Sequence, residues 1–422
     1  MSTSPVPSAP PAPVLSTPPV TTAPVGVSER KLIFLLASVQ FINIVDFMMV
    51  MPLGPDFAKA LTIPSSYLGL ITGSYTASAA IAGLVAAQFI DRFDRRRALF
   101  VAMLGLVMGT VAGGFSTGLT SMLVSRVVAG AFGGPATALT LSILTDAVPP
   151  ERRGKAMGAL FGSFSVASVL GVPAGLELAR LGGWKAPFFV TGALGVVIAS
   201  AAASVMPAMR GHLGRGKLTP TRPLGAFLAD PTVLLSFAGI AVSMMGTFAI
   251  VANLSSYIQF NLGYPREHIG ILYTAGGLFS FVAMRLAGKQ ADKRGSFVVV
   301  LAGTVLITAI IGIGFLGPRP LIPVIGIFIG FMVANPTRMV ALNALTSRVP
   351  APQERGRFMS LQSTVQHLAS AVGSGASTWI LRERPDRSLS GMPTLALGAM
   401  GLALTLPPLV RALARRIAAR AT

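Results

Sequence analysis

The sequence predicts an all-α membrane protein in which twelve spanning helices form two similar six-helix halves. Three observations lead to this prediction: long apolar blocks, short basic clusters between them, and loop motifs that recur at a constant offset. Of the 422 residues, 52% are apolar and only 11% are charged, and the mean hydropathy is +0.70. A soluble domain carries roughly a quarter of its residues as charged side chains, so a soluble globule is excluded.

The apolar blocks are long enough to cross a bilayer. A helix needs about 20 apolar residues to span roughly 30 Å of hydrocarbon. The expected spans are residues 31–53, 66–90, 98–116, 119–146, 155–177, 187–207, 231–256, 268–288, 296–316, 321–347, 357–380 and 391–411. Because the number of spans is even, both termini should lie on the same side of the membrane.

The distribution of basic residues predicts the orientation. The net charge is +20, but Lys and Arg occur in short clusters between apolar blocks, which favours a membrane protein over a nucleic-acid-binding one. With the N-terminus inside, about 23 of them face the cytoplasm and about eight face outward, as the positive-inside rule requires. We therefore expect both termini in the cytoplasm. The absence of cysteine excludes disulfides, thiol nucleophiles and Cys-ligated metals.

The chain divides into five expected segments. Residues 1–28 are rich in Pro, Ser, Thr and Ala, which predicts a disordered cytoplasmic tail, with a Pro-rich docking segment as the alternative. Residues 29–207 form the first six-helix half and residues 231–411 form the second. Between them, residues 208–230 are basic and broken by prolines, which predicts a cytoplasmic linker. Residues 412–422 form a basic cytoplasmic tail.

The two halves share loop motifs. Residues 87–96 (AQFIDRFDRR) follow the second span and resemble residues 288–295 (GKQADKRG) after the eighth. Residues 151–157 (ERRGKAM) follow the fourth span and resemble residues 353–359 (QERGRFM) after the tenth. The matching aspartates lie 201 positions apart and the matching glycines 202. Two independent pairs at nearly the same offset indicate a duplication in parallel orientation, the plan of one large transporter class.

Together with other elements, these motifs resemble the major facilitator superfamily over nearly the whole chain. The family's loop motif, G-x-x-x-D-R-x-G-R-R, fits the second copy, whereas the first copy departs at Ala87 and Asp94. Further matches are R-x-x-x-G at residues 126–130, the drug-and-sugar efflux pattern at residues 171–188, and residues 46–55, which are similar to a bacterial efflux subgroup. The resemblance implies two pseudo-symmetric six-helix bundles in a bacterial inner membrane.

Asp46 is the most informative polar residue. It lies roughly 22 Å into the first expected helix, where an acid is costly unless it has a partner or a function. Burial raises the pKa of a carboxyl group and a nearby cation lowers it, so the hypotheses are reversible protonation and a fixed ion pair. Arg126, roughly 13 Å into the fourth helix, is the expected cation, with helix packing as its alternative role. The resemblance implies that both helices face the central cavity, where we expect the two side chains to interact.

The resemblance also implies a gate at the loops. Asp91 is expected to cap the N-terminus of the eleventh helix, where free N–H groups favour an anion, and Arg92 belongs to the same turn. Arg95 is expected to reach Asp146 and form an inter-domain latch that favours the outward-facing state. Asp94 replaces a glycine of the family's motif, and Asp adopts left-handed backbone conformations less readily, so the usual turn is in doubt.

The second copy of the loop is expected to play a weaker, matching role. Its residues Gly288, Asp292 and Arg294 should face the fifth helix. For both copies, a solvated turn without special function is the alternative.

The fifth span contains a predicted helix-packing stretch at Gly171, Pro173 and Gly175. Pro removes a helical hydrogen bond, and small residues let a neighbouring helix approach closely. The pattern partly matches a family motif that accompanies antiport, and packing alone is the alternative explanation.

Six residues are candidates for the wall of a substrate cavity: Asn43, Phe47, Met49, Met245, Arg338 and His367. Phe and Met would suit an apolar compound, although positions facing lipid or core are the alternative. Arg338 could contact an anionic group of the cargo or a structural partner. His367 lies near the middle of the eleventh span, as a hydrogen-bonded packing residue or as a second titrating group.

The predicted function is proton-coupled secondary transport, in which the proton gradient drives the export of a small apolar or amphipathic compound by antiport. A proton symporter or facilitator for a sugar or an organic anion is the alternative, and a receptor or scaffold without transport is a third hypothesis. We expect membrane lipids and a small-molecule substrate as partners, no nucleic acid, no cofactor, no metal and a monomeric state. No nucleotide-binding G-x-x-x-x-G-K-[ST] loop is present, which argues against direct ATP coupling and against an enzyme.

Overall fold

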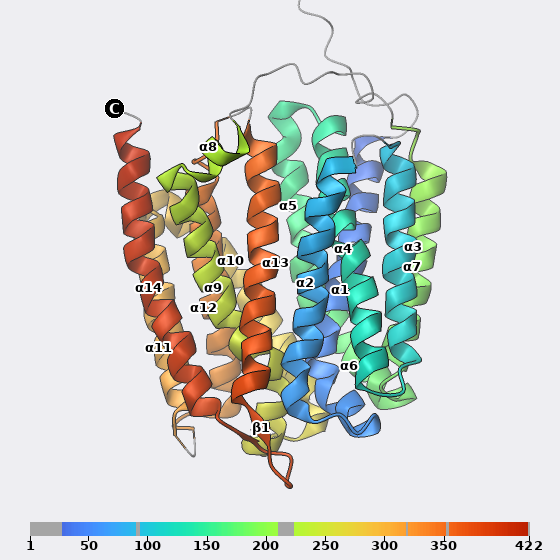
Figure 1. Cartoon of the computed structure of the whole chain (residues 1–422), viewed down its shortest axis with the longest axis vertical. Helices are drawn as coiled ribbons and strands as arrows, with labels where there is room; N and C mark the ends of the chain where they lie inside the picture. Colours follow the sequence, from blue (N-terminus) through green and yellow to red (C-terminus); the bar gives the residue numbers. More distant parts are fainter. Residues whose placement is uncertain (1–27, 90–92, 210–222, 318–319, 352–353, 421–422) are drawn as a thin grey trace, which may run out of the picture.

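A computed structural model describes residues 28–89, 93–209, 223–317, 320–351 and 354–420. Nearly all of these residues belong to long helices that run side by side (Figure 1). The predicted tail, residues 1–28, lies outside the described residues except for Ser28, which accepts a hydrogen bond from the backbone N–H of Lys31 and so caps the first helix. Most of the predicted linker, residues 210–222, also lies outside them.

The first bundle contains the elements up to residue 205. They are α1 (Glu29–Ala60), the 3₁₀ turn η1 (Ser65–Tyr67), α2 (Leu68–Phe89), α3 (Arg95–Gly114), α4 (Leu119–Ala147), α5 (Pro150–Val166), the π-helical η3 (Ala167–Gly171), α6 (Val172–Gly182) and α7 (Ala186–Val205). Because α5, η3 and α6 follow one another without a break, they make one span. A short helix, α8 (Leu224–Leu228), precedes the second bundle.

The second bundle follows the same plan. Its elements are α9 (Pro231–Ser256), the π-helical η4 (Tyr257–Asn261), the 3₁₀ turn η5 (Arg266–His268), α10 (Ile269–Arg294), α11 (Ser296–Phe315), α12 (Val324–Thr346), α13 (Arg355–Ile380) and α14 (Met392–Ala419). A two-stranded antiparallel hairpin, β1 (Arg382–Glu383) with β2 (Leu389–Ser390), connects α13 to α14. This hairpin is an addition to the predicted all-α fold.

The described helices account for all twelve predicted spans. Eleven of them are long and apolar enough to cross a membrane by length and composition. The twelfth, α13, has 26 residues but carries many polar side chains on its surface, and it packs between α2 and α9. A helix buried between two others needs fewer apolar side chains than one exposed to lipid.

Two of the predicted spans are shorter than the helices that contain them. The first helix continues past residue 53 to Ala60 and contains Pro52 and Pro55. Pro interrupts a soluble helix because it loses a backbone hydrogen bond, but neighbouring helices make it tolerable in a membrane bundle. At the other end of the chain, α14 continues through much of the predicted tail to Ala419, where the Arg420 side chain forms an ion pair with Asp230, 2.6 Å away.

The predicted bend in the fifth span coincides with the π-helical turn η3. Pro173, just after it, cannot donate to the carbonyl four residues earlier, and its ring crowds that carbonyl, so a local widening to π-helix is a natural response. A Cβ at Gly171 would overlap the side chain of Val45, and one at Gly175 would lie 3.8 Å from Met49 Cβ. The stretch therefore packs closely against α1.

The start of α1 and the end of α14 lie at the same end of the molecule, and the β1–β2 hairpin lies at the opposite end, at the bottom of the view (Figure 1). We call these the terminal end and the hairpin end. The bundle of α1–α7 and the bundle of α9–α14 lie side by side between them (Figure 1).

Polar contacts join the two bundles at the hairpin end. Arg266, before α10, forms a bidentate ion pair with Asp56 of α1, with Nη2 2.5 Å from Oδ2 and Nε 2.8 Å from Oδ1. The backbone N–H of Ser65 donates to the Glu383 carboxylate of the hairpin. Nearby, the Ser255 hydroxyl of α9 donates to the backbone carbonyl of Pro52, 3.3 Å away.

Small residues let α2 and α13 touch across the same boundary. A Cβ at Gly69 would overlap the backbone oxygen of Ser374 and the Ser377 hydroxyl, and one at Gly73 would come within 2.9 Å of Ser374 Oγ. Such close backbone approach is how membrane helices associate without a hydrophobic driving force. The contact therefore depends on glycine at these two positions of α2.

We predict that Gly69→Leu opens the hairpin end. The added side chain must displace backbone atoms of α13, and overpacking of this kind costs about 1–3 kcal/mol, or roughly 5- to 150-fold in a two-state population. The native chain has no cysteine, so a single Ser255→Cys reporter, buried at this boundary, measures the opening. Its reaction rate with a membrane-impermeant thiol reagent should rise in the Gly69→Leu background.

Gly83→Leu is the matched control on the same helix, because no atom lies within 4 Å of the position its Cβ would take. An equal rise in the thiol reaction rate for both variants would show that the α2–α13 contact does not hold this end closed.

Candidate functional site

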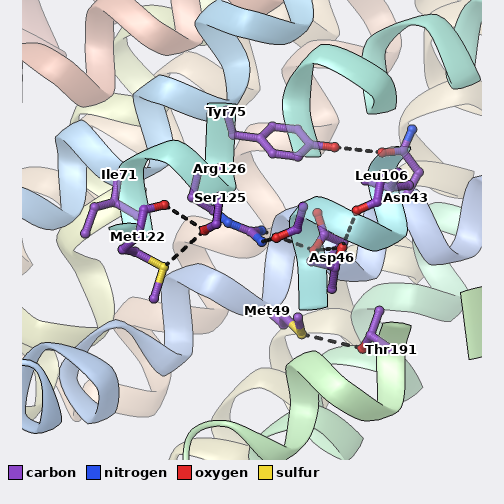
Figure 2. Close-up of polar contacts among 12 residues, drawn as sticks. Asn43, Asp46, Met49, Ile71, Tyr75, Leu106, Met122, Ser125, Arg126 and Thr191 are labelled. Carbon is purple, nitrogen blue, oxygen red and sulfur yellow. Dashed lines mark hydrogen bonds and ion pairs between the residues drawn. The ribbon is translucent and has the colours of Figure 1, made fainter. Parts of the chain in front are cut away.

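An ion pair between Asp46 of α1 and Arg126 of α4 lies inside the first bundle. Arg126 Nη1 is 3.1 Å from Asp46 Oδ1, and the two side chains are 1% and 0% exposed. Figure 2 shows the guanidinium group pointing at the carboxylate. The predicted pairing of these two residues is therefore present, whereas their roles in proton coupling stay a prediction.

The α3 helix completes the surroundings of the pair. The Thr110 hydroxyl donates to Asp46 Oδ1 at 2.7 Å and also lies 2.9 Å from the backbone oxygen of Leu106. Arg126 Nη2 donates to the backbone oxygen of Gly109 at 3.2 Å. A Cβ at Gly109 would lie 2.7 Å from Ala129 Cα, so glycine is what allows α3 to approach α4 this closely.

The hydrogen bonds to the carboxylate are asymmetric. Asp46 Oδ1 accepts from both Arg126 and Thr110, while Oδ2 is buried and accepts from none of the residues that the structure describes. Removing one partner of a buried ion pair leaves an uncompensated charge and costs about 3–5 kcal/mol. The pair therefore holds α1, α3 and α4 together as well as forming a candidate proton site.

Asn43 lies one helical turn from Asp46 and clamps three helices. Its Nδ2 donates to the Gly133 backbone oxygen at 2.8 Å and to the Thr137 hydroxyl at 2.7 Å, both on α4. The Tyr75 hydroxyl of α2 donates to its Oδ1 at 2.7 Å (Figure 2). Since both ends of the amide are used, Asn43 has a structural role here, whereas its place on the wall of a substrate cavity stays a prediction.

A small cavity borders the ion pair on the side of α2. Arg126 lines it together with Phe47, Val50, Ile71, Thr72 and Tyr75. The Phe47 ring lies 5.1 Å from the Tyr75 ring and 5.9 Å from the Phe248 ring of α9, so it reaches the second bundle. Of the predicted cavity residues, Phe47 is thus placed at the boundary between the bundles, within reach of the buried pair.

Met49 is placed differently from its prediction. It is fully buried, and its sulfur lies 3.7 Å from the Thr191 hydroxyl of α7 (Figure 2). It therefore belongs to the core of the first bundle and not to a cavity wall. The reason is its helical position: residues 46 and 49 are three apart and share a face of α1, and that face points into the bundle.

The predicted cavity residues of the second bundle differ in burial. Arg338 is 2% exposed inside that bundle, where its Nη2 donates to Asn335 Oδ1 at 2.7 Å and lies 3.3 Å from the Thr247 hydroxyl. Met245 and His367 are half-buried. The His367 imidazole has no hydrogen bond to any residue within the described ranges, so the expected hydrogen-bonded packing role is not seen.

The predicted gate is only partly described. Asp91 and Arg92 lie outside the described residues. Arg95 Nη1 contacts the Asp146 carboxylate and also donates to the backbone oxygen of Ser142 at 3.0 Å. Because Arg95 begins α3 and Asp146 ends α4, this pair lies within one bundle, and the prediction that it links the two bundles is wrong.

The two copies of the loop motif differ at the position of the family's second glycine. Asp94 has a φ of −58°, and its side chain accepts from the backbone N–H of Arg96 at 3.0 Å, so it caps α3. Gly295, 201 positions later, has a φ of +86°. The first copy of the loop therefore forms a different turn from the second copy, as the replacement of glycine by Asp94 suggested. Asp292 and Arg294 are exposed in the last turn of α10. Because α10 packs against the fifth span, their matching role toward that span stays a prediction.

Sequence reasoning missed Thr110 and Tyr75. Each is a polar residue within an apolar span, which is the available signal, but many other Ser and Thr residues share it. Only the packing of the helices shows that Thr110, 64 positions from Asp46, meets its carboxylate.

Comparison with known proteins identifies the class. Residues 36–374 match the Major Facilitator Superfamily, and the chain belongs to this family of membrane transporters. It is therefore an integral membrane transporter and not an enzyme. The chain is 26% identical to a chloramphenicol resistance protein of Streptomyces lividans over 64% of its own length and 69% of the relative's. It is 22% identical to multidrug resistance protein 2 of Bacillus subtilis over 82% and 88% of the two lengths.

A solved structure has the same fold. A bacterial homologue of the human lysosomal transporter Spinster, in an inward-facing and occupied conformation, superposes with a TM-score of 0.71 at 16% identity, over 92% of this chain and 98% of that one. The likeness confirms the fold. Among the relatives with an efflux name is a purine ribonucleoside efflux pump of Escherichia coli O157:H7, which is 26% identical over 62% of this chain and 67% of its own length.

We predict that Thr110→Val destabilises the folded protein more than a comparable substitution elsewhere. A hydrogen bond to a charged group contributes about 1.5–3 kcal/mol, against about 1 kcal/mol for a neutral one. Thr140→Val is the matched control, because the Thr140 hydroxyl is equally buried but donates only to the Ala136 carbonyl of its own helix. Thermal unfolding of the two purified variants makes the comparison, and equal losses would show that Thr110 contributes nothing through Asp46.

Proposed function

We propose that this chain is a proton-coupled efflux antiporter that exports a small apolar or amphipathic compound by alternating access. One observation supports this above the others: a carboxylate buried in a membrane bundle, with one oxygen bound twice and the other free of described partners. An intramembrane acid that only stabilised the fold would be expected to use both oxygens. The free Oδ2 of Asp46 is where a proton would bind.

The coupling follows from the shared position of Arg126. This residue both pairs with Asp46 and lines the small cavity of the first bundle whose wall includes Phe47, the residue that reaches the second bundle. Protonation of Asp46 would remove the negative charge that holds the guanidinium group of Arg126. The guanidinium group would then be free to interact with a molecule in the cavity. Cargo in the cavity and a proton on Asp46 would thus compete through Arg126, and the competition drives antiport.

This cycle requires the two bundles to rock against each other, and the surface along which they would separate is visible in the fold. The described polar contacts between the bundles include a bidentate ion pair of Arg266 with Asp56 and a hydrogen bond from Ser65 to Glu383 at the hairpin end. These contacts would break in the alternate state. With the terminal end in the cytoplasm of a bacterial inner membrane, the arrangement corresponds to a state closed toward the outside.

The apolar lining of the boundary supports an apolar or amphipathic cargo. Phe47, Val50 and Ile71 border the cavity beside Arg126, and related proteins are named for resistance to chloramphenicol and to multiple drugs. We propose a monomer in contact with membrane lipids as the working unit, with the proton gradient in place of any cofactor.

A proton symporter or facilitator for an organic anion or a sugar is the second candidate. The deep cations Arg126 and Arg338, both buried in the bundles, favour an anionic cargo. The two candidates differ in the direction of the proton relative to the cargo.

We predict that Asp46→Asn lowers uphill transport driven by a pH gradient by at least tenfold. Exchange of cargo across the membrane in the absence of a gradient should be unchanged. Asn keeps the shape but cannot exchange a proton. Because the variant leaves Arg126 unpaired, its stability should fall as well, so transport is measured in proteoliposomes on the folded fraction, with both driven uptake and counterflow as readouts.

Two further variants separate coupling from folding. Asp46→Glu keeps a titratable group and should recover part of the driven transport. Glu177→Gln removes an exposed carboxylate of α6, which is paired only with Arg180 of the same helix among the described residues, and should leave transport unchanged. Intact pH-driven transport by Asp46→Asn would refute the proton role.

We predict that chloramphenicol, the first compound of a panel of apolar and anionic candidates, evokes proton movement opposite to its own in proteoliposomes loaded with a pH-sensitive dye. Movement in the same direction would favour the symporter. The absence of both cargo flux and proton flux with every compound would favour a receptor or scaffold.

A further inference from the structure

The second bundle contains a buried cation that no acid among the described residues neutralises. Arg338 of α12 is 2% exposed, and its hydrogen bonds to described residues run from Nη2 to two neutral groups, Asn335 Oδ1 at 2.7 Å and Thr247 Oγ1 at 3.3 Å. Its Nε is buried without a partner among the described residues. A guanidinium group has five N–H donors, and the structure supplies acceptors for only part of them.

No carboxylate of this half of the chain lies near enough to balance the charge. Residues 231–411 contain five acidic residues, all of them in short turns, at helix ends or in the β1–β2 hairpin: Glu267, Asp292, Glu354, Glu383 and Asp386. Arg338 forms no ion pair with any residue that the structure describes. A full charge in an apolar bundle is costly unless it is compensated, so something other than a side chain is expected to balance this one.

The first bundle shows what is missing. Its buried arginine, Arg126, is paired with Asp46. The repeat offset of 201 relates Asp46 to Thr247, and Thr247 is one of the two groups that contact Arg338. The second bundle thus keeps a buried arginine beside the position that corresponds to the acid, but a neutral hydroxyl occupies that position.

The surrounding helices leave space for the Arg338 side chain. A Cβ at Gly303 of α11 would come within 2.7 Å of Arg338 Cγ, so glycine there makes room for the stem. The guanidinium group borders a small internal cavity between four helices, lined by Val242, Gly246, Thr247, Ile307, Ile311, Phe331, Asn335, Arg338, Ala399 and Ala403. Apart from Arg338, Asn335 and Thr247, every lining residue is apolar.

We propose that this cavity is a binding site for a small monovalent anion of the size of chloride. The anion would accept from the free N–H groups of Arg338 and supply the negative charge that Asp46 supplies in the first bundle. The cavity is small and is enclosed by Ile, Phe and Ala side chains, which suits a single small ion. Its lining residues all belong to the second bundle, whereas those of the cavity beside Arg126 belong to the first. The anion site is therefore separate, and it does not depend on the proposed direction of transport.

A bound anion would neutralise Arg338 of α12, which also contacts Thr247 of α9, and so would stabilise the contact between these two helices. Binding to the folded state alone stabilises that state in proportion to the logarithm of the ligand concentration. Chloride should therefore raise the unfolding temperature in a saturable way. Gluconate, which is too large for the cavity, should not.

The test is a chloride titration of the full-length protein purified in detergent, with gluconate replacing chloride at constant ionic strength and the midpoint of thermal unfolding as the readout. We expect the wild-type midpoint to rise by several degrees and to saturate. Asn335→Asp supplies a carboxylate at the atom that already contacts Arg338 Nη2, so this variant should have a high midpoint in gluconate and no response to chloride. Arg338→Gln should also lose the response.

Arg285→Gln is the matched control, because Arg285 is an exposed arginine of α10 that stacks on Phe281, with the guanidinium carbon 4.2 Å from the ring centre. This variant should keep the full chloride response. A wild-type protein that unfolds at the same temperature in chloride and in gluconate would overturn the proposal, and so would an Asn335→Asp variant that responds to chloride as the wild type does. Because these two results do not involve Arg338→Gln, the proposal can be tested even if that variant does not fold.

Discussion

A charge inside an apolar helix bundle has no water to solvate it, and this constraint organises the centre of each half of the molecule. In the first half, the Asp46 carboxylate and the Arg126 guanidinium group neutralise each other, and Thr110 and the Gly109 carbonyl take up further hydrogen-bonding capacity. Three helices are thereby fixed relative to one another. The same interaction leaves one carboxylate oxygen free of described partners, so the contact that stabilises the bundle also contains the group that could exchange a proton.

Helix contacts in the rest of the fold depend on small residues. Apolar side chains gain little from leaving lipid for a protein interior that is equally apolar, so close packing and hydrogen bonds decide which helices touch. Gly69 and Gly73 let α2 reach α13 between the bundles, and Gly171 lets the π-helical turn of the fifth span reach α1. A transporter that rocks about such a boundary needs contacts that form and break, and backbone approach with a few ion pairs suits this better than an interlocked apolar core.

The two halves share a scaffold but have diverged in charge. Asp46 corresponds to Thr247, and the capping Asp94 corresponds to Gly295 with its positive φ. In the first half, Asp94 caps α3, whereas in the second half Arg338 has only neutral hydrogen-bonding partners among the described residues. The candidate proton site therefore lies in the first half, and the buried arginine without a described acidic partner lies in the second.

The sequence by itself determined the membrane class, the twelve spans, the duplication, the depth of Asp46 and its pairing with Arg126. Composition, block length and motif offset carry the first four of these directly, whereas the pairing was expected from the family resemblance, which implies that both helices face the central cavity. Only the tertiary structure decided which faces of the helices point inward: Met49 packs in the core, Asn43 clamps α4, Thr110 reaches Asp46, and Arg95 meets Asp146 within one bundle. In a soluble protein, the alternation of polar and apolar residues would mark these faces in advance. Here lipid and protein interior are both apolar, so the sequence periodicity does not distinguish them, and the inward face is settled by packing alone.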